Sequence, residues 1–160
     1  MTDQLLADEL FRFFQRYLAF YNDFLQLETK KYNDIAINNV SSLDQHVKSE
    51  EAFMLKSKGL ELERDRLVAR TGKPDATFRE LIPLFESPLQ EQIQKIYNEL
   101  SQVLLNLKET NLRCNYLTDL RLHRIEIDLK KLENRPDLQK LYNAQAHPGE
   151  AHRNFISKKI

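Results

Sequence analysis

The distribution of glycine and proline is the feature that most constrains how this chain can fold. Residues 1–58 and 89–135 contain neither; seven of the eight glycines and prolines lie at 72–88 or beyond residue 135. Inside a helix, glycine costs about 1 kcal/mol and proline about 3 relative to alanine, so stretches free of both can form long helices. Alternating strand patterns and Asn-Gly or Asp-Gly hairpin dipeptides are absent. The sequence therefore predicts an all-α fold.

The first predicted helix covers residues 3–39 and carries a wide apolar stripe. Its apolar residues recur at steps of three and four: Leu6, Leu10, Phe13, Phe14, Tyr17, Phe20, Tyr21, Phe24 and Leu27. Four more widen the stripe at seven-residue intervals: Phe11, Leu18, Leu25 and Tyr32. A stripe of this width favours burial between two partner helices. We expect the aromatic rings to form core rather than a ligand slot.

A second helix is predicted from Ser42 to the Thr71–Gly72 pair. Ser42 and Gln45 match a capping box, in which each side chain pairs an otherwise free backbone N–H. Gly72 suits the left-handed residue that ends a helix. The break at residues 38–42 is either a reversal or a kink. We expect a reversal, because Ser42 has no capping role otherwise.

A short connector and a third long helix follow. Thr77 and Glu80 form another capping-box match, which predicts a short helix over residues 78–85. Ser87 as N-cap and Pro88 in the first helical position start a helix that stops before Pro136. About 46 residues at a rise of 1.5 Å span roughly 70 Å, so its neighbours should also be long. We predict an elongated antiparallel bundle of three long helices, with a bundle domain over residues 1–133.

Residues 134–160 differ in character and are predicted to form a flexible C-terminal tail. Prolines, a glycine and a basic end surround two short apolar clusters: Leu138, Leu141 and Tyr142, then Phe155 and Ile156. These residues are too few and too scattered for a core, and a disordered segment has no other physical reason to cluster them. We predict that they bind a partner, with Tyr142 as the aromatic anchor. The alternative is that the tail packs on its own bundle.

Asn111 and Asn115 interrupt the apolar stripe of the third helix. They either set the register inside the bundle, as a buried asparagine does in coiled coils, or form a hydrogen-bonding patch for a partner helix. We include both among the candidate partner-binding residues. Cys114 lies between them at a core spacing and is expected to behave as a small buried hydrophobe.

Composition narrows the function classes. The 24 basic and 24 acidic residues give no net charge, so neither a nucleic-acid nor an anionic membrane surface is indicated. No apolar run is long enough for membrane insertion, and the N-terminus lacks the pattern of a signal peptide. With one cysteine, no internal disulfide can form, and we expect a cytoplasmic protein. Because nucleophile, phosphate-loop and metal-ligand motifs are missing, we expect no enzyme, cofactor or metal.

The order of these features resembles the FlgN-type flagellar export chaperones. The resemblance rests on the Asn/Ser break, the segment LDQHVKSEE at 43–51 leading into LELERDRL at 60–67, and ETNLRCN at 109–115 on the long final helix. It covers residues 5–132 and the general character of the tail. The aromatic-rich first helix departs from the leucine- and glutamate-rich pattern of that family.

The resemblance implies a cytoplasmic chaperone for flagellar hook-associated proteins. Such a protein binds their C-terminal helical segments, prevents premature assembly and delivers them to export-gate components of the type III system. It is expected to be a monomer or weak homodimer. The alternative is a structural coiled-coil scaffold, or a self-associating helical adaptor with no client, which should form a tight oligomer alone.

Overall fold

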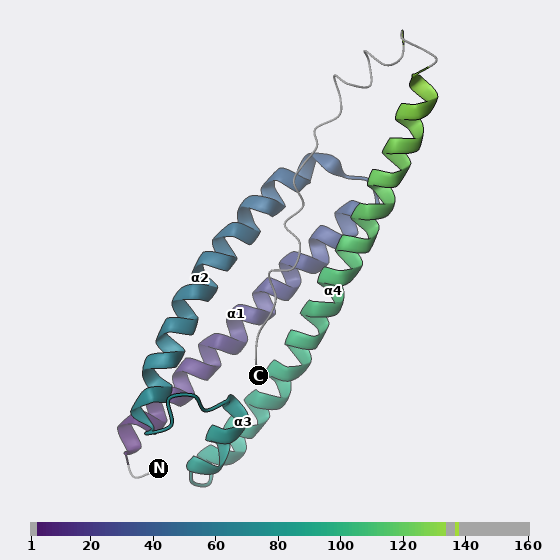
Figure 1. Ribbon diagram of the computed structural model, residues 1–160. Helices are drawn as coiled ribbons and strands as arrows, with labels where there is room; N and C mark the ends of the chain where they lie inside the picture. Colours follow the sequence, from purple (N-terminus) through teal and green to yellow (C-terminus); the bar gives the residue numbers. More distant parts are fainter. Residues whose placement is uncertain (1–2, 134–136, 138–160) are drawn as a thin grey trace.

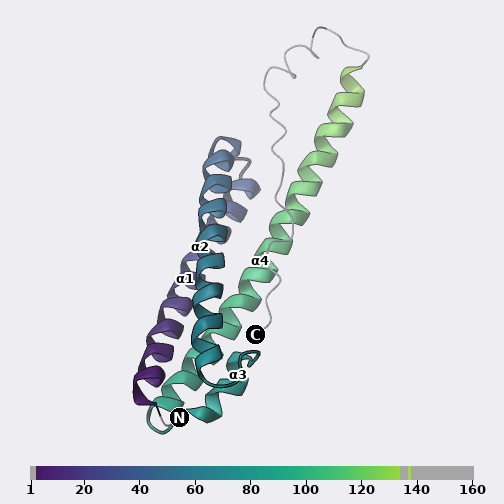
Figure 2. The same cartoon turned by 60° about the vertical axis from the view of Figure 1, so that its left-hand side comes forward.

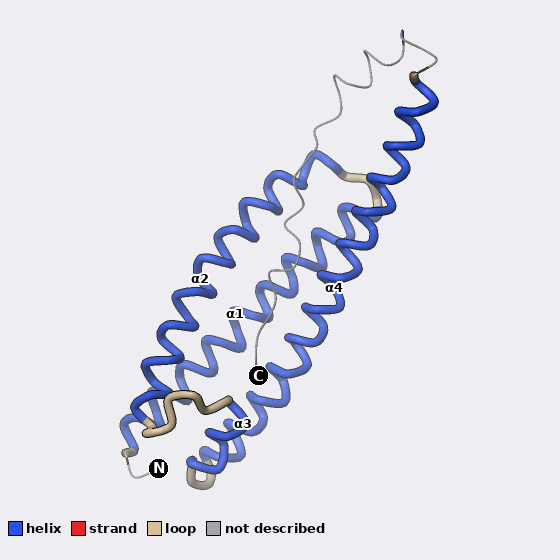
Figure 3. Tube along the Cα trace, in the orientation of Figure 1, coloured by secondary structure: helices blue, strands red, loops and turns tan. Residues whose placement is uncertain are grey.

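The computed structural model describes residues 3–133 and 137. Its long helices are α1 (Gln4–Ala36), α2 (Leu43–Arg70) and α4 (Leu89–Leu132). The short elements are the 3₁₀ turns η1 (Val40–Ser42) and η2 (Ile82–Leu84) and the helix α3 (Phe78–Leu81). Figure 3 shows helices joined by short loops throughout this part of the chain. The predicted all-α fold of three long helices and a short connector helix is confirmed.

Helix α1 lies between the other two long helices. It packs against both α2 and α4, whereas α2 and α4 approach each other far less closely. Successive long helices run in opposite directions, so α1 and α4 run the same way (Figures 1 and 2). The bundle is therefore built around α1, as the width of its apolar stripe predicts.

An apolar cluster fills one end of this bundle, which we call the apolar half. It takes residues from α1 as far as Phe24, from α2 after Leu60 and from α4 as far as Leu107. Phe13 is fully buried, Phe20 is 4% exposed, and Phe24 stacks on Phe53 with ring centroids 5.1 Å apart. The prediction that these aromatics form core is confirmed.

The connector closes the apolar half. Thr77 accepts a hydrogen bond from the Glu80 backbone, and the Glu80 side chain accepts one from the Thr77 backbone, so the predicted capping box is present. Phe78 and Leu81 are buried, and the Phe78 ring stacks on Tyr97 of α4. The connector thus contributes to the same core.

Helix α2 begins directly after Ser42 as predicted, but the capping bonds predicted at the starts of α2 and α4 are absent. Ser42 makes no capping bond, because η1 runs directly into α2 and the Ser42 hydroxyl instead donates to Asp34 Oδ2 at 3.0 Å. Helix α4 begins at Leu89 with Pro88, rather than Ser87, as its N-cap, and the Gln90 side chain donates to the Ile82 carbonyl. The predicted reversal near residue 40 and the left-handed Gly72 (φ 82°) are confirmed.

The lengths of the helices also differ from expectation. At 1.5 Å per residue, α1 spans about 50 Å and α4 about 66 Å. Helix α1 ends at Ala36, not residue 39, since Ile37 closes it and Asn38 takes a left-handed φ of 60°. In Figure 1, α4 continues past the ends of both other helices. The neighbours of α4 are long as expected, but α4 is the longest of the three.

Candidate partner-binding surface

Arg121 marks the level at which α4 leaves the bundle. Its guanidinium Nη2 donates to the backbone carbonyls of Ala36 at 3.0 Å and Ile35 at 3.5 Å, which are the last two of α1. Residues 122–132 extend beyond this contact, and we call them the overhang. Figure 2 shows this part of α4 standing clear of α1 and α2.

The apolar face that packs inside the bundle continues along the overhang. Leu107, Asn111 and Cys114 are buried against α1 and α2, and further steps of three and four lead to Ile125. The same line ends at Leu129 and Leu132. Leu122 is 41% exposed and Ile125 36% exposed. The sequence repeats a core pattern here without a described helix to cover it.

A second apolar line runs along the outer side of α4. It contains Leu105, Leu112, Tyr116 and Leu120, spaced by seven, four and four residues. Tyr116 is 68% exposed and Leu112 54%. Helix α4 therefore presents apolar side chains to solvent on its outer face and, beyond Arg121, on its inner face as well.

The predicted asparagine pair lies where the bundle interior meets this surface. Asn111 is 4% exposed, and its Oδ1 accepts a hydrogen bond from Asn115 Nδ2 at 3.4 Å. Asn115 is half-buried, one turn nearer the overhang. Asn111 Nδ2 is buried without a hydrogen-bond partner. The structure thus brings both residues together on α4, and their role in partner binding stays a prediction.

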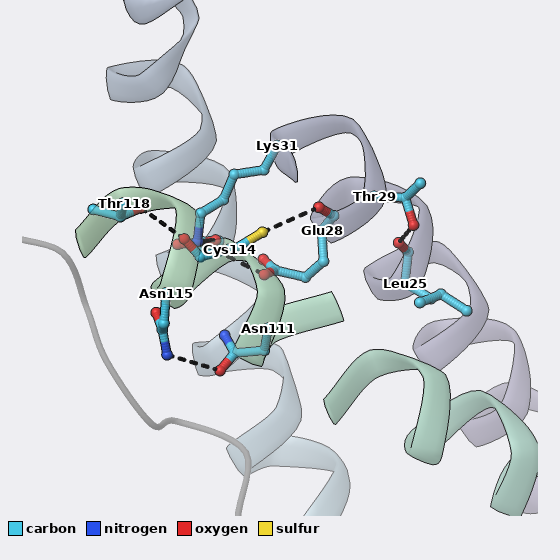
Figure 4. A network of polar contacts seen from close by, with 9 residues as sticks. Leu25, Glu28, Thr29, Lys31, Asn111, Cys114, Asn115 and Thr118 are labelled. Carbon is cyan, nitrogen blue, oxygen red and sulfur yellow. Dashed lines mark hydrogen bonds and ion pairs between the residues drawn. The ribbon is translucent and has the colours of Figure 1, made fainter. Parts of the chain in front are cut away.

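Charged side chains from the other helices converge on Asn111 and form a buried polar layer. Glu28 and Lys31 come from α1, and Glu50 comes from α2. Lys31 Nζ donates to Glu50 Oε1 at 2.5 Å and lies 3.7 Å from Glu28 Oε2. Glu28 is fully buried and Glu50 is 2% exposed. Figure 4 shows Glu28 and Lys31 beside Asn111 and Cys114 of α4.

The electrostatics of this layer follow from its burial. The pKa of the Glu28 carboxyl is raised from 4.5 to about 8, chiefly by loss of water and also by Glu50, while Lys31 and Asn111 act in the opposite direction. Burial lowers the pKa of Lys31, but attraction to Glu28 and Glu50 outweighs it, so the net shift is upward. Burial also raises the pKa of the Cys114 thiol to about 12. Cys114 is 1% exposed, as its spacing predicts.

Sequence reasoning overlooked this layer, although a signal for it exists. Phe14, Tyr21, Glu28 and Ile35 recur every seven residues along α1, and all four are buried. On α2, steps of four and three join His46, Glu50 and Phe53. A strict heptad count would have placed Glu28 and Glu50 at core positions despite their charge.

The remaining predicted site residues lie outside the described part of the chain. They are Leu138, Leu141, Tyr142, Phe155 and Ile156. Their proposed contact with a partner stays a prediction, as do the flexibility of residues 134–160 and the domain boundary at residue 133. No helix among the described residues combines the length and hydropathy needed to cross a membrane.

Comparison with known proteins gives one match. No curated protein and no solved structure proved similar to the chain. A family model described as FlgN protein matches residues 1–149 of the 160. The match includes the aromatic helix α1, which departed from the expected pattern, as well as the overhang of α4. The predicted resemblance is confirmed over nearly the whole chain, and the chain belongs to the FlgN family of flagellar export chaperones.

Proposed function

We propose that this chain is a cytoplasmic chaperone, without catalytic activity, that binds the C-terminal helical segments of flagellar hook-associated proteins. It keeps those segments from assembling early and delivers them to the type III export gate. The observation that carries the proposal is the overhang of α4 in a chain of the FlgN family. A core-type apolar face without a covering helix is what an amphipathic client helix can occupy.

The energetics favour reversible binding. Leu122 and Ile125 are partly exposed, and covering apolar surface contributes about 25 cal/mol per Å². The overhang is only about 17 Å long, at 1.5 Å for each of its 11 residues, so it can bury a few turns of a partner helix. A client that is disordered when free also loses conformational entropy on binding. These terms favour moderate affinity, which suits a chaperone that must release its client.

The test is co-purification of candidate hook-associated proteins with the wild-type chain and with Ile125→Glu. A buried charge in the contact should weaken client binding at least about tenfold, or about 1.4 kcal/mol. Leu55→Glu is the matched control, since Leu55 is a 73% exposed leucine on α2. Circular dichroism should show that both variants keep the wild-type helicity.

The same experiment separates the chaperone from the self-associating scaffold. For a chaperone, sedimentation should show a monomer or weak dimer that forms a one-to-one complex with the client. If no client binds and Ile125→Glu instead dissociates a stable oligomer of the chain, the overhang is a self-association surface and the chaperone proposal fails.

A further inference from the structure

The buried polar layer has a charge imbalance. With every group ionised, Glu28 and Glu50 contribute two negative charges and Lys31 one positive charge. These are the groups that face Glu28 from α1 and α2; from α4 it is faced by Asn111, which is neutral, and by Cys114, whose thiol donates weakly to the Glu28 backbone carbonyl at 3.8 Å. The layer therefore lacks one positive charge.

Geometry shows which carboxylate is compensated less well, because Lys31 Nζ lies 2.5 Å from Glu50 but 3.7 Å from Glu28. Glu50 accepts the short hydrogen bond from Lys31, whereas both carboxyl oxygens of Glu28 are buried and lack a hydrogen-bond partner. An ionised carboxylate in such a position costs several kcal/mol in lost hydration. The layer is not arranged as a metal site either, because no three His, Cys, Asp or Glu side chains among the described residues are placed to hold a cation.

The region around the layer depends on polar contacts. We call residues 28–52 and 108–121 the polar half of the bundle. Its buried apolar residues are Ile35 and Cys114. The other contacts that join its helices include the His46–Asp34 pair at 2.5 Å and the bonds from Arg121 to the end of α1. Little apolar burial is available here to offset an uncompensated charge.

We propose that Glu28 and Glu50 together bind one proton in the closed bundle, and that its loss separates α4 from α1 and α2 above Leu107. Bound, the proton leaves the layer with one carboxylate opposite one ammonium group. When it dissociates to solvent, the remaining negative charge lowers its energy by becoming hydrated, which requires the helices to part. The apolar half stays closed, since its core contains no comparable group.

Opening of the polar half also exposes the buried face of α4 that precedes the overhang. The buried line of α4 through Asn111 and Cys114 continues directly into Ile125. Resting on the proposed function, this means that proton loss lengthens the face available to a client helix by about three turns. Partner binding and proton release are then linked, so each favours the other.

The sign of the pH dependence follows from the raised pKa of Glu28. Between about 4.5 and 8 the folded chain holds a proton that the unfolded chain has lost. The stability from this group is complete below the lower value and is lost as pH rises through the upper one. One proton changes the unfolding equilibrium constant by at most about tenfold per pH unit.

The first experiment measures urea unfolding of the wild-type chain and Glu28→Gln from about pH 5.5 to 7.5, inside the window set by the two Glu28 pKa values. The glutamine keeps the shape of the protonated acid, so the wild-type unfolding constant should rise about tenfold per pH unit relative to the variant. Glu63→Gln is the control, because Glu63 pairs with Arg16 at the surface of the bundle, away from the buried layer. Parallel profiles for wild type and Glu28→Gln would overturn the proposal.

The second experiment locates the opening and needs no client. Amide hydrogen exchange is compared at about pH 6 and pH 9, on either side of the Glu28 pKa, after correction for intrinsic exchange. Protection of residues 108–121 should fall at least about tenfold in the wild type and stay constant in Glu28→Gln, while residues 93–104 keep theirs. Equal loss of protection along α4 in both proteins would show that the proton does not control a local opening.

Discussion

Up to Phe24 of α1 the three long helices meet through rings and aliphatic side chains, whereas beyond it they meet through charges and amides. The apolar half contains every residue of the main core cluster. The polar half buries Glu28, Glu50, His46 and Asn111 instead. Apolar contacts hold at any pH and tolerate small shifts, while a buried charge network depends on protonation and on complete pairing. The same bundle can therefore have one end that stays closed at any pH and another whose closure depends on protonation.

The two halves also differ in how many elements of the chain cover them. Residues of the apolar half are enclosed by α1, α2, α4 and the connector together, because α3 and η2 lie against the start of α4. Among the described residues, no such lid covers the polar half, which adjoins the overhang (Figure 1). Stability along α4 should fall in the order apolar half, polar half, overhang.

The largest expected effect comes from breaking the apolar half. Phe13→Ala removes a fully buried ring that contacts Phe14 and Tyr17, with centroids 5.4 Å away in each case. Substitutions of this kind cost about 3–5 kcal/mol, measured by urea unfolding. Leu5→Ala, at a 66% exposed site, should cost less than about 0.5 kcal/mol. Equal effects at both sites would refute the core assignment.

Breaking the polar half should cost about 3 kcal/mol near neutral pH, below the Glu28 pKa, where the layer is closed. Lys31→Met removes the cation and leaves two buried carboxylates without it. The loss should shrink as the pH falls, because protonation removes the negative charge that Lys31 balances. Adding Glu50→Gln should restore part of the stability. A pH-independent loss, unaffected by the second change, would mean that Lys31 acts through packing alone.

A smaller effect is expected at the boundary between bundle and overhang. Arg121→Ala removes the two bonds to the last carbonyls of α1 and should cost about 1 kcal/mol. Faster amide exchange near residue 36 should accompany the loss. Arg124→Ala is the control, since Arg124 is exposed and pairs only with Asp128 one turn along the same helix, at 3.7 Å. Comparable losses in the two variants would exclude a role for Arg121 in fixing the end of α1.

The smallest effect on stability should come from deleting residues 134–160. We expect the helicity and melting temperature of the full chain to persist, because the described core lies before residue 115. Client or gate binding should nevertheless fall, with Tyr142→Ala reproducing part of that loss. A large drop in melting temperature with binding intact would instead support packing of the tail on its own bundle.

Much of the fold was accessible from sequence because it depends on local signals. The spacing of Phe13, Tyr17, Phe20 and Phe24 fixed a buried face, and the Thr77–Glu80 pair fixed a cap. The caps predicted at Ser42 and Ser87 each matched a local motif, but tertiary contacts replaced them. The Ser42 hydroxyl donates to Asp34, and at the start of α4 the Gln90 side chain donates to the Ile82 carbonyl. The polar layer was missed for a related reason. Glu28 and Glu50 look like solvated charges until the tertiary structure shows that Lys31 and α4 cover them.

The reactivity of Cys114 can report the opening of the polar layer. As the one cysteine of the sequence, it lies in the polar layer with its thiol shielded from solvent and its pKa raised to about 12. Thiolate is the reactive form, so labelling reagents can modify it only when α4 moves away and the group regains water. The rate at which Cys114 is modified therefore measures how long the polar layer stays closed between openings. This rate can be measured on the wild-type protein, because no cysteine has to be introduced into the helices.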